Sequence, residues 1–208
     1  MGRRSDHTRD ELKGMVLKAA GSIIAQEGLR ALTTRRLGKH IGYAAGTLYQ
    51  LYRNLDDIIL HVNTQTLEAM LLACSDVDLE RAPEEALLDL ADRYLSFIER
   101  HPRLWSALFE HAVPVDFEWP IRYNELIATL LGLVVKPLAT LIPHDETLVR
   151  HEARTMWSCL YGIGSLALWE KMAEGESPRA MIASLVANYL AGLRFTRGLS
   201  EQSPRTVD

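Results

Sequence analysis

Apolar residues recur every three or four positions along most of this chain, and no stretch alternates apolar and polar residues between turn signals. That spacing places apolar side chains on one face of an α-helix, whereas a half-buried strand requires strict alternation. The sequence therefore predicts an all-α fold, and its 208 residues suffice for one or two domains. The first such stripe contains Leu12, Val16, Ala19, Ala20, Ile23 and Ile24.

Capping residues, glycines and prolines predict where the helices begin and end. The first helix begins near Thr8 and ends at Gly28, and a short second helix begins at Thr33 or Thr34 and ends at Gly42. A third covers about residues 45–52, and a fourth begins at Asp56 and Asp57. Later helices are expected at about 83–101, 102–109, 120–141, 147–174 and 178–197, with Pro137 kinking or ending its helix and residues 199–208 disordered.

Charge is distributed unevenly along the chain. Residues 1–55 carry ten Lys and Arg against four Asp and Glu, a net charge of +6, whereas residues 56–208 carry −10. A basic first quarter predicts that a polyanion-binding surface lies at the N-terminal end, although a merely solvated charged helix would have the same composition. The two cysteines, Cys74 and Cys159, lie far apart and predict no disulfide or zinc site.

Two short helices around a glycine-containing turn, between residues 33 and 52, fit a helix-turn-helix. Leu48 and Tyr52 are one turn apart and predict the inward face of the second helix. Small residues at its start permit close approach to DNA, while Thr47, Tyr49 and Gln50 offer contacts to bases and phosphates. The predicted DNA-binding residues are Thr34, Arg35, Arg36, Lys39, Ala45, Gly46, Thr47, Tyr49, Gln50 and Arg53.

Residues 19–59, AAGSIIAQEGLRALTTRRLGKHIGYAAGTLYQLYRNLDDII, resemble the tetracycline-repressor (TetR-like) family of bacterial transcriptional regulators. The shared pattern is a first helix ending in glycine, two threonines, a short helix, a glycine and the sequence G-T-L-Y. The resemblance implies that Thr34, Thr47 and Tyr49 contact DNA. It also implies a homodimeric repressor that binds an inverted-repeat operator and is released by a small-molecule effector.

Three positions depart from the family pattern. Leu51 and Leu55 stand where the family usually has a histidine and a phosphate-contacting lysine, and Ala44 stands where it often has a serine-type cap. Arg53 would replace the missing phosphate contacts in part. Alternatively, the two leucines lie four residues apart and pack together to orient the recognition helix.

The C-terminal part predicts a dimer interface and an effector pocket. The last two helices carry more apolar surface than one helix pair needs, and in the family these helices form a four-helix interface; an ordinary intrachain core is the alternative. The predicted interface residues are Trp157, Tyr161, Leu166, Trp169, Ile182, Leu185, Tyr189 and Leu193. Tyr94, Phe97, His101, Trp105, Phe109, Trp119 and Tyr123 are candidate ligand-binding residues, with core packing as the alternative.

The remaining motifs favour no catalytic function. GIGSLA, residues 162–167, matches a dinucleotide-binding pattern, but its flanks predict continuous helix, where two glycines allow close helix contact. No cofactor, metal site, membrane span or enzymatic activity is expected, and the protein is expected in the cytoplasm. The expected domains are 1–56 for DNA binding, 57–198 for effector binding and dimerisation, and 199–208 as a tail. An all-α enzyme or ligand-binding protein with a structural helix-turn-helix, and a ligand-independent helical adaptor, are the alternatives.

Overall fold

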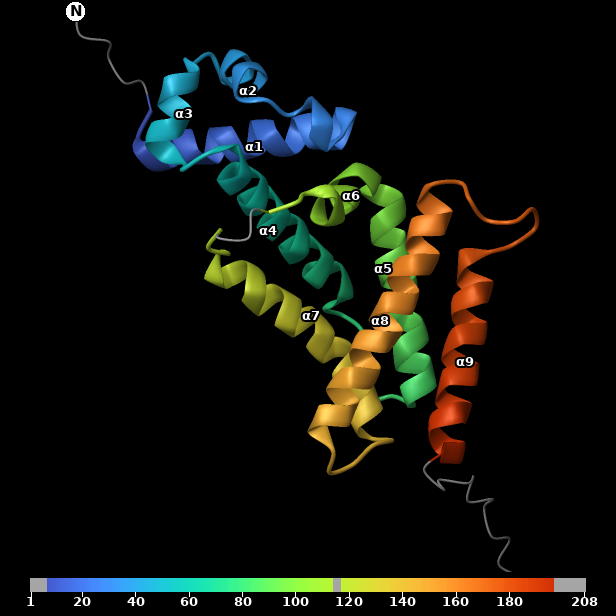
Figure 1. Ribbon diagram of the computed structural model, residues 1–208. Coiled ribbons are helices and arrows are strands. Elements are labelled where there is room, and N and C mark those ends of the chain that lie inside the picture. Colours follow the sequence, from blue (N-terminus) through green and yellow to red (C-terminus); the bar gives the residue numbers. More distant parts are fainter. Residues whose placement is uncertain (1–6, 114–116, 197–208) are drawn as a thin grey trace, which may run out of the picture. The chain divides into compact units, whose positions relative to one another are not determined.

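Two short helices follow the first helix of the chain, and tight turns separate them. In the computed structural model, which describes residues 7–113 and 117–196, α1 spans Arg9–Glu27, a 3-10 turn spans Leu29–Ala31, α2 spans Thr34–Ile41 and α3 spans Ala45–Leu51 (Figure 1). The other helices are α4 (Leu55–Cys74), α5 (Pro83–Arg100), α6 (Pro102–Glu110), α7 (Ile121–Ala139), α8 (Glu146–Leu168) and α9 (Pro178–Thr196). These residues contain no strand, which confirms the all-α prediction. Pro114 and the predicted tail, 199–208, lie outside the described residues.

Local side-chain chemistry explains where the first helices begin and end. Thr8 and Glu11 form a capping box at α1, and the hydroxyl of Thr33 accepts a hydrogen bond from the backbone N–H of Arg36 at α2. Gly28 and Gly42 end these helices with φ angles of 87° and 75°, which glycine adopts without steric cost. The predicted boundaries of these two helices are therefore confirmed.

The chain forms two compact units. The first contains Met1–Leu72 and Phe97–Ala128, and the second contains Ala73–Ser96 and Thr129–Asp208. In the first unit, the helix-turn-helix and the beginning of α4 share one core, to which Ala107 of α6 also contributes. The largest side chains in this core include Ile24, Leu37, Leu48, Tyr52 and Ile58.

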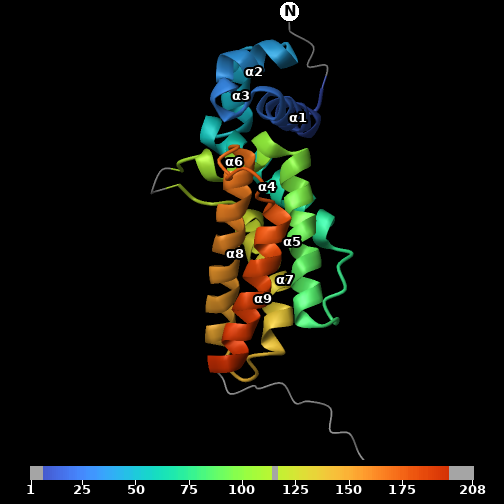
Figure 2. The ribbon, with the colours of Figure 1, turned by 90° about the vertical axis from the view of Figure 1, so that its right-hand side faces the viewer.

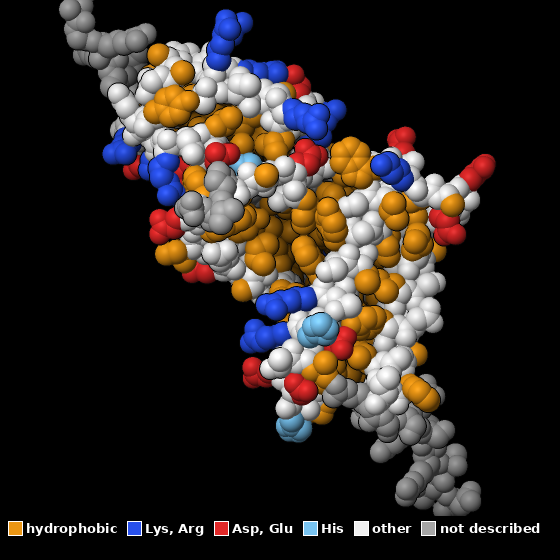
Figure 3. Space-filling view, in the orientation of Figure 1, with side chains coloured by type: hydrophobic (Ala, Val, Ile, Leu, Met, Phe, Trp, Pro, Cys, Tyr) orange, Lys and Arg blue, Asp and Glu red, His pale blue; other side chains and the backbone are white. Residues whose placement is uncertain are grey.

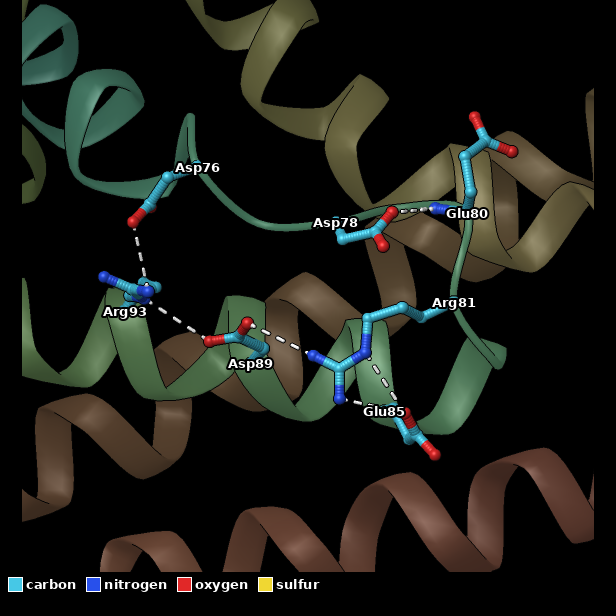
Figure 4. Close-up of polar contacts among 7 residues, drawn as sticks. All are labelled: Asp76, Asp78, Glu80, Arg81, Glu85, Asp89 and Arg93. Carbon is cyan, nitrogen blue, oxygen red and sulfur yellow. Dashed lines mark hydrogen bonds and ion pairs between the residues drawn. The ribbon is translucent and has the colours of Figure 1, made fainter.

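Within the second unit, ion pairs fasten the segment after α4 to α5 (Figure 4). Arg93 contacts Asp76 at 3.2 Å and Asp89 at 3.3 Å. Arg81 contacts the second carboxylate oxygen of Asp89 at 3.7 Å, and it contacts Glu85 at 2.9 Å. The carboxylate of Asp89 contacts both arginines and links them into one network. Each arginine side chain therefore gains two contacts for the conformational entropy that it loses.

A small apolar cluster in the second unit contains Cys74, Val77 and Leu90. Burial raises the pKa of the Cys74 thiol to about 11, so this cysteine stays protonated and unreactive at neutral pH.

α8 and α9 pack side by side in the second unit (Figure 2). α8 ends at Leu168, earlier than the expected residue 174, and Glu170 takes a positive φ of 51° directly after it. Residues 162–167 lie within α8, so their glycines form no turn of the dinucleotide-binding kind. Pro137 lies inside α7 and the helix ends two residues later, at Ala139, as expected for a proline that ends its helix.

Candidate nucleic-acid interface

The turn between α2 and α3 brings two backbones into close contact at Gly38. A Cβ atom on this residue would lie 2.7 Å from the carbonyl oxygen of Tyr43 and 3.5 Å from the backbone nitrogen of Ala45. The carbonyl of Gly38 also accepts a hydrogen bond from the N–H of Tyr43, at 2.9 Å. Only glycine fits here without movement of the turn, and the position of α3 therefore depends on Gly38.

One face of α3 is anchored in the core of the first unit. Leu48 is 1% exposed and Tyr52 is 4% exposed, which confirms the inward face expected for this helix. The Tyr52 hydroxyl donates a hydrogen bond to the carbonyl oxygen of Lys13 in α1, at 3.2 Å. α3 is thus fixed against α1 by apolar packing and by one polar contact.

The opposite face of α3 is accessible. Tyr49 is 54% exposed, Gln50 and Gly46 are exposed, and Ala45 and Thr47 are half-buried. Ala44 precedes the helix and provides no side-chain hydrogen bond to its first N–H groups. The small side chains at the start of α3 allow a negatively charged backbone to approach this end of the helix.

Cationic side chains project from the helices around α3, and Figure 3 shows Lys and Arg side chains on this part of the surface. Arg35 and Lys39 of α2 are exposed, and Thr34 is half-buried in the first turn of the same helix. Arg36 is also exposed, but its guanidinium forms an ion pair with Glu27 at the end of α1. A phosphate would therefore have to compete with Glu27 for Arg36.

Arg53 has several partners within the first unit. Its guanidinium lies 3.7 Å from Asp57 and 3.8 Å from Glu118, and 4.6 Å from the ring centroid of Phe117. The buried carboxylate of Asp57 also accepts a hydrogen bond from the Arg53 N–H, at 2.9 Å. Asn54 caps α4 through the N–H of Asp57. Arg53 therefore helps to fix the junction between α3 and α4, and its charge is partly compensated.

The two leucines that depart from the family pattern are half-buried. Leu51 and Leu55 both pack against the hydrophobic core of the first unit. Packing is the interpretation that their sequence spacing favoured. Lysine at position 55 would have to withdraw apolar surface from this contact before it could reach a phosphate.

The candidate ligand-binding residues fall in both units. Tyr94 is a buried residue of the second unit, whereas the others belong to the first. There they form three ring pairs with centroids 4.9 Å apart in each: Phe97 with His101, Trp105 with Phe109, and Trp119 with Tyr123. Phe97, Trp105 and Tyr123 are buried, whereas His101, Phe109 and Trp119 are exposed.

Two polar residues with buried side chains, Asn63 and His111, were not among the predicted site residues. The amide nitrogen of Asn63 donates to the carbonyl oxygen of Ala107 at 3.3 Å, and Nε2 of His111 donates to Asp56 at 2.9 Å. Among the described residues, Oδ1 of Asn63 and Nδ1 of His111 have no hydrogen-bond partner. Oδ1 of Asn63 is a hydrogen-bond acceptor, and Nδ1 of His111 is a second buried polar atom without a partner.

The predicted interface residues differ in exposure. Ile182 is 2% exposed and belongs to the core of its own unit, and Leu185, Tyr189 and Leu193 are half-buried. Tyr189 donates its hydroxyl proton to the Glu152 carboxylate, and burial together with this bond raises its pKa. On α8 and just after it, Trp157, Leu166 and Trp169 are 36%, 42% and 56% exposed, and Tyr161 is half-buried and stacked with Trp157.

Other kinds of site find little support among the described residues. No three His, Cys, Asp or Glu side chains are grouped so that they could hold a metal ion. None of the helices in this part of the chain is sufficiently long and apolar to cross a bilayer.

Two family models match the sequence over most of its length. Residues 16–62 match the model for bacterial regulatory proteins of the tetR family, and residues 87–189 match the tetracyclin repressor-like C-terminal domain. The first match covers α2, α3 and the surrounding ends of α1 and α4. The second begins in α5 and ends in α9.

Known proteins resemble most of the chain. The HTH-type transcriptional regulator Rv0681 of Mycobacterium tuberculosis is 25% identical, over 88% of this chain and 83% of its own length. The solved structure of BioQ with its double-stranded DNA operator has a TM-score of 0.64 at 17% identity, covering 86% of this chain and 98% of BioQ. FadR from Bacillus subtilis in complex with stearoyl-CoA has a TM-score of 0.59 at 15% identity, covering 86% and 96%. These two structures establish the likeness of fold.

Proposed function

The chain belongs to the tetracycline-repressor family of transcriptional regulators, and from that premise we propose that it is a homodimeric repressor that binds an inverted-repeat operator and is released by a small molecule. In this proposal residues 1–56 bind DNA, and residues 57–198 bind the effector and dimerise. The protein acts in the bacterial cytoplasm and catalyses no reaction.

The observation that carries the proposal is the orientation of α3. Leu48 and Tyr52 hold one face in the core, which leaves Tyr49 and Gln50 on the accessible face. Gln50 can pair with the edge of an adenine through two hydrogen bonds, and Tyr49 can donate to a phosphate. α3 enters the major groove, and Arg35 and Lys39 contact the phosphate backbone beside it. They lie on α2, which corresponds to the first helix of a helix-turn-helix and crosses that backbone.

The geometry of B-form DNA supports a dimer. Two recognition helices must lie about 34–36 Å apart to enter successive major grooves, and a two-fold symmetric protein reads an inverted repeat. The exposed apolar side chains Trp157, Leu166 and Trp169 support α8 as part of the contact between subunits. Ile182 contributes to the core that supports this surface.

Buried aromatic rings and an unpartnered acceptor support effector binding in the larger part of the chain. Oδ1 of Asn63 favours a ligand that provides a hydrogen-bond donor beside an apolar body. Asn63 lies on α4, which follows directly after the helix-turn-helix. A ligand that binds one arrangement of α4 better than another shifts the equilibrium between DNA-binding and released states.

Selection of bound fragments from random duplex DNA with the full-length protein tests the proposal. We expect an enriched inverted repeat, and affinity for it should fall by about 10²–10⁴ when salt rises fourfold. Gln50→Ala should relax preference at one position in each half-site, whereas Lys39→Ala should weaken all sequences alike. Enrichment of no sequence, together with salt-insensitive binding, would overturn the proposal.

A further inference from the structure

The beginning of α1 contacts the chain at both ends of α3. Nδ1 of His7 and the hydroxyl of Tyr43, in the turn before α3, lie 3.0 Å apart, and their rings meet edge to face. The guanidinium of Arg9 donates a hydrogen bond to the backbone carbonyl oxygen of Gln50, near the end of α3, at 3.3 Å. These pairs are 36 and 41 positions apart in the sequence, so both contacts depend on the folded first unit.

The side chain of Arg9 extends from a backbone that is itself held in place. Arg9 is the first residue of α1, directly after the cap residue Thr8. The backbone N–H of Glu11 donates to the Thr8 hydroxyl at 3.2 Å, and the backbone N–H of Thr8 donates to the Glu11 carboxylate at 2.7 Å. This capping box fixes the first turn of the helix. Arg9 is exposed, and the Gln50 carbonyl is its hydrogen-bond partner within the described part of the chain.

Apolar packing holds α3 on one face only. Leu48 and Tyr52, one turn apart, are buried in the core. Gln50 lies midway between them in the sequence and is exposed on the other side, because two residues of an α-helix are about 200° apart around its axis. Its carbonyl group belongs to the last turn, where the helix itself provides no N–H partner. Arg9 provides a donor for this carbonyl and so restrains the backbone of Gln50 directly.

We propose that Arg9 is a positioning residue for base readout, which holds the backbone of Gln50 so that the Gln50 amide meets the edge of an adenine. The inference rests on the proposed function, in which Gln50 pairs with adenine through two hydrogen bonds. Such a pair tolerates little displacement, because both bonds need near-linear geometry and normal length at the same time. A recognition residue must be held within about 0.5 Å of its productive position. Arg9 therefore affects selectivity without contacting a base itself.

The competing role for an exposed arginine beside a recognition helix is a contact to phosphate. A phosphate contact gains the same free energy on every duplex and releases counterions, so it changes affinity and salt dependence but not the preference between bases. A positioning role changes the preference itself. The ratio of affinities for two duplexes that differ at the base pair read by Gln50 separates these roles. A smaller fraction of folded protein leaves that ratio unchanged, because it weakens apparent binding to both duplexes alike.

The test uses the full-length protein and two duplexes, the selected operator and a copy changed only at the base pair whose preference Gln50→Ala relaxes. Arg9→Ala removes the donor, and Arg9→Lys keeps the charge but not the planar guanidinium. Lys18→Ala is the matched control, because it removes one positive charge from an exposed position of the same helix. Lys18 lies on the opposite face of α1, since nine residues correspond to about two and a half turns. Combining Arg9→Ala with Gln50→Ala completes a double-mutant cycle.

We expect wild type to prefer the selected duplex by about tenfold or more, the discrimination typical of a paired amide. Arg9→Ala should lower this ratio by about threefold or more, which is the usual effect of one lost hydrogen bond. Arg9→Lys should give an intermediate ratio, and Lys18→Ala should keep the wild-type ratio. In the Gln50→Ala background, Arg9→Ala should not change the ratio further, because the side chain that reads the base is already absent.

Two results would overturn the inference. If both Arg9 variants keep the wild-type ratio, whatever their affinity, Arg9 does not position the reading side chain. If Arg9→Ala changes the ratio by the same factor with and without the Gln50 side chain, it acts through a different base contact. In both cases selective binding by wild type leaves the proposed function standing. Wild type that prefers no duplex would instead refute the proposed function, and the inference with it.

Discussion

Gly38→Ala tests whether the close contact between α2 and the following turn sets the position of the recognition helix. The new Cβ atom would lie 2.7 Å from the carbonyl oxygen of Tyr43, and ordinary contact begins at 3.4 Å. The turn must therefore move by about 0.7 Å. Its neighbour is backbone, which cannot rotate away as a flexible side chain can. Crowding of this kind costs about 1–3 kcal/mol.

A second effect has the opposite sign. Alanine within a helix is more favourable than glycine by about 0.5–1 kcal/mol, and Gly38 lies inside α2. The net loss in the free energy of unfolding should therefore be about 1 kcal/mol. DNA affinity should fall further, by about 10- to 100-fold, because a displaced α3 loses base contacts worth about 1–3 kcal/mol each.

Gly14→Ala is the matched control for this prediction. Gly14 lies in α1, and its Cβ would meet nothing within 4 Å. This variant should gain about 0.5–1 kcal/mol in stability and keep its DNA affinity. Thermal unfolding followed by circular dichroism and fluorescence anisotropy with the selected operator measure the two quantities. If Gly38→Ala gains stability as Gly14→Ala does and binds DNA normally, the close contact has no role in placing α3.

Three further predictions concern packing, pH and assembly. Leu55→Lys should lower both the melting temperature and DNA affinity, because Leu55 packs against the core; tighter, more salt-sensitive binding at an unchanged melting temperature would contradict this. Burial raises the pKa of Tyr52 to about 12, so the folded state keeps its proton at a pH where the unfolded chain releases it. The free energy of unfolding, measured by urea titration at each pH, should therefore fall between about pH 10 and 12, and it should fall less steeply with pH in Tyr52→Phe. An equal fall with pH in both proteins would refute this. Leu166→Glu should give a folded monomer in sedimentation at micromolar concentration, whereas Ile121→Glu, at another exposed apolar position, should stay dimeric; a dimeric Leu166→Glu would place the interface elsewhere.

Local rules predicted much of the N-terminal part correctly. Thr8, Gly28 and Gly42 act through neighbours in the sequence, so their capping roles and backbone angles follow from residue type. The inward direction of Leu48 and Tyr52 follows from helical periodicity in the same way. The end of α8 shows the limit of these rules, because Glu170 takes the left-handed conformation that glycine normally signals.

Contacts between distant residues could not be predicted from spacing. Arg36 was expected to be available for phosphate, but it pairs with Glu27 at the end of the preceding helix. The partners of Arg53 include Glu118, which is 65 positions away and has no local pattern that marks it. Gly38 was likewise missed, because its importance lies in a close approach to Tyr43 that only the folded turn creates.

The ion pair between Arg36 and Glu27 affects the lifetime of the proposed complex with DNA. When Arg36 moves to a phosphate, Glu27 loses its partner while a polyanion lies nearby. That repulsion partly offsets the attraction of Arg36 for every duplex, irrespective of sequence. In the proposed complex Glu27 therefore weakens binding to DNA of any sequence and shortens each encounter with it. The base contacts proposed for Gln50 are unaffected, so the carboxylate shortens the lifetimes of operator and non-operator complexes alike and leaves the choice between them to those contacts.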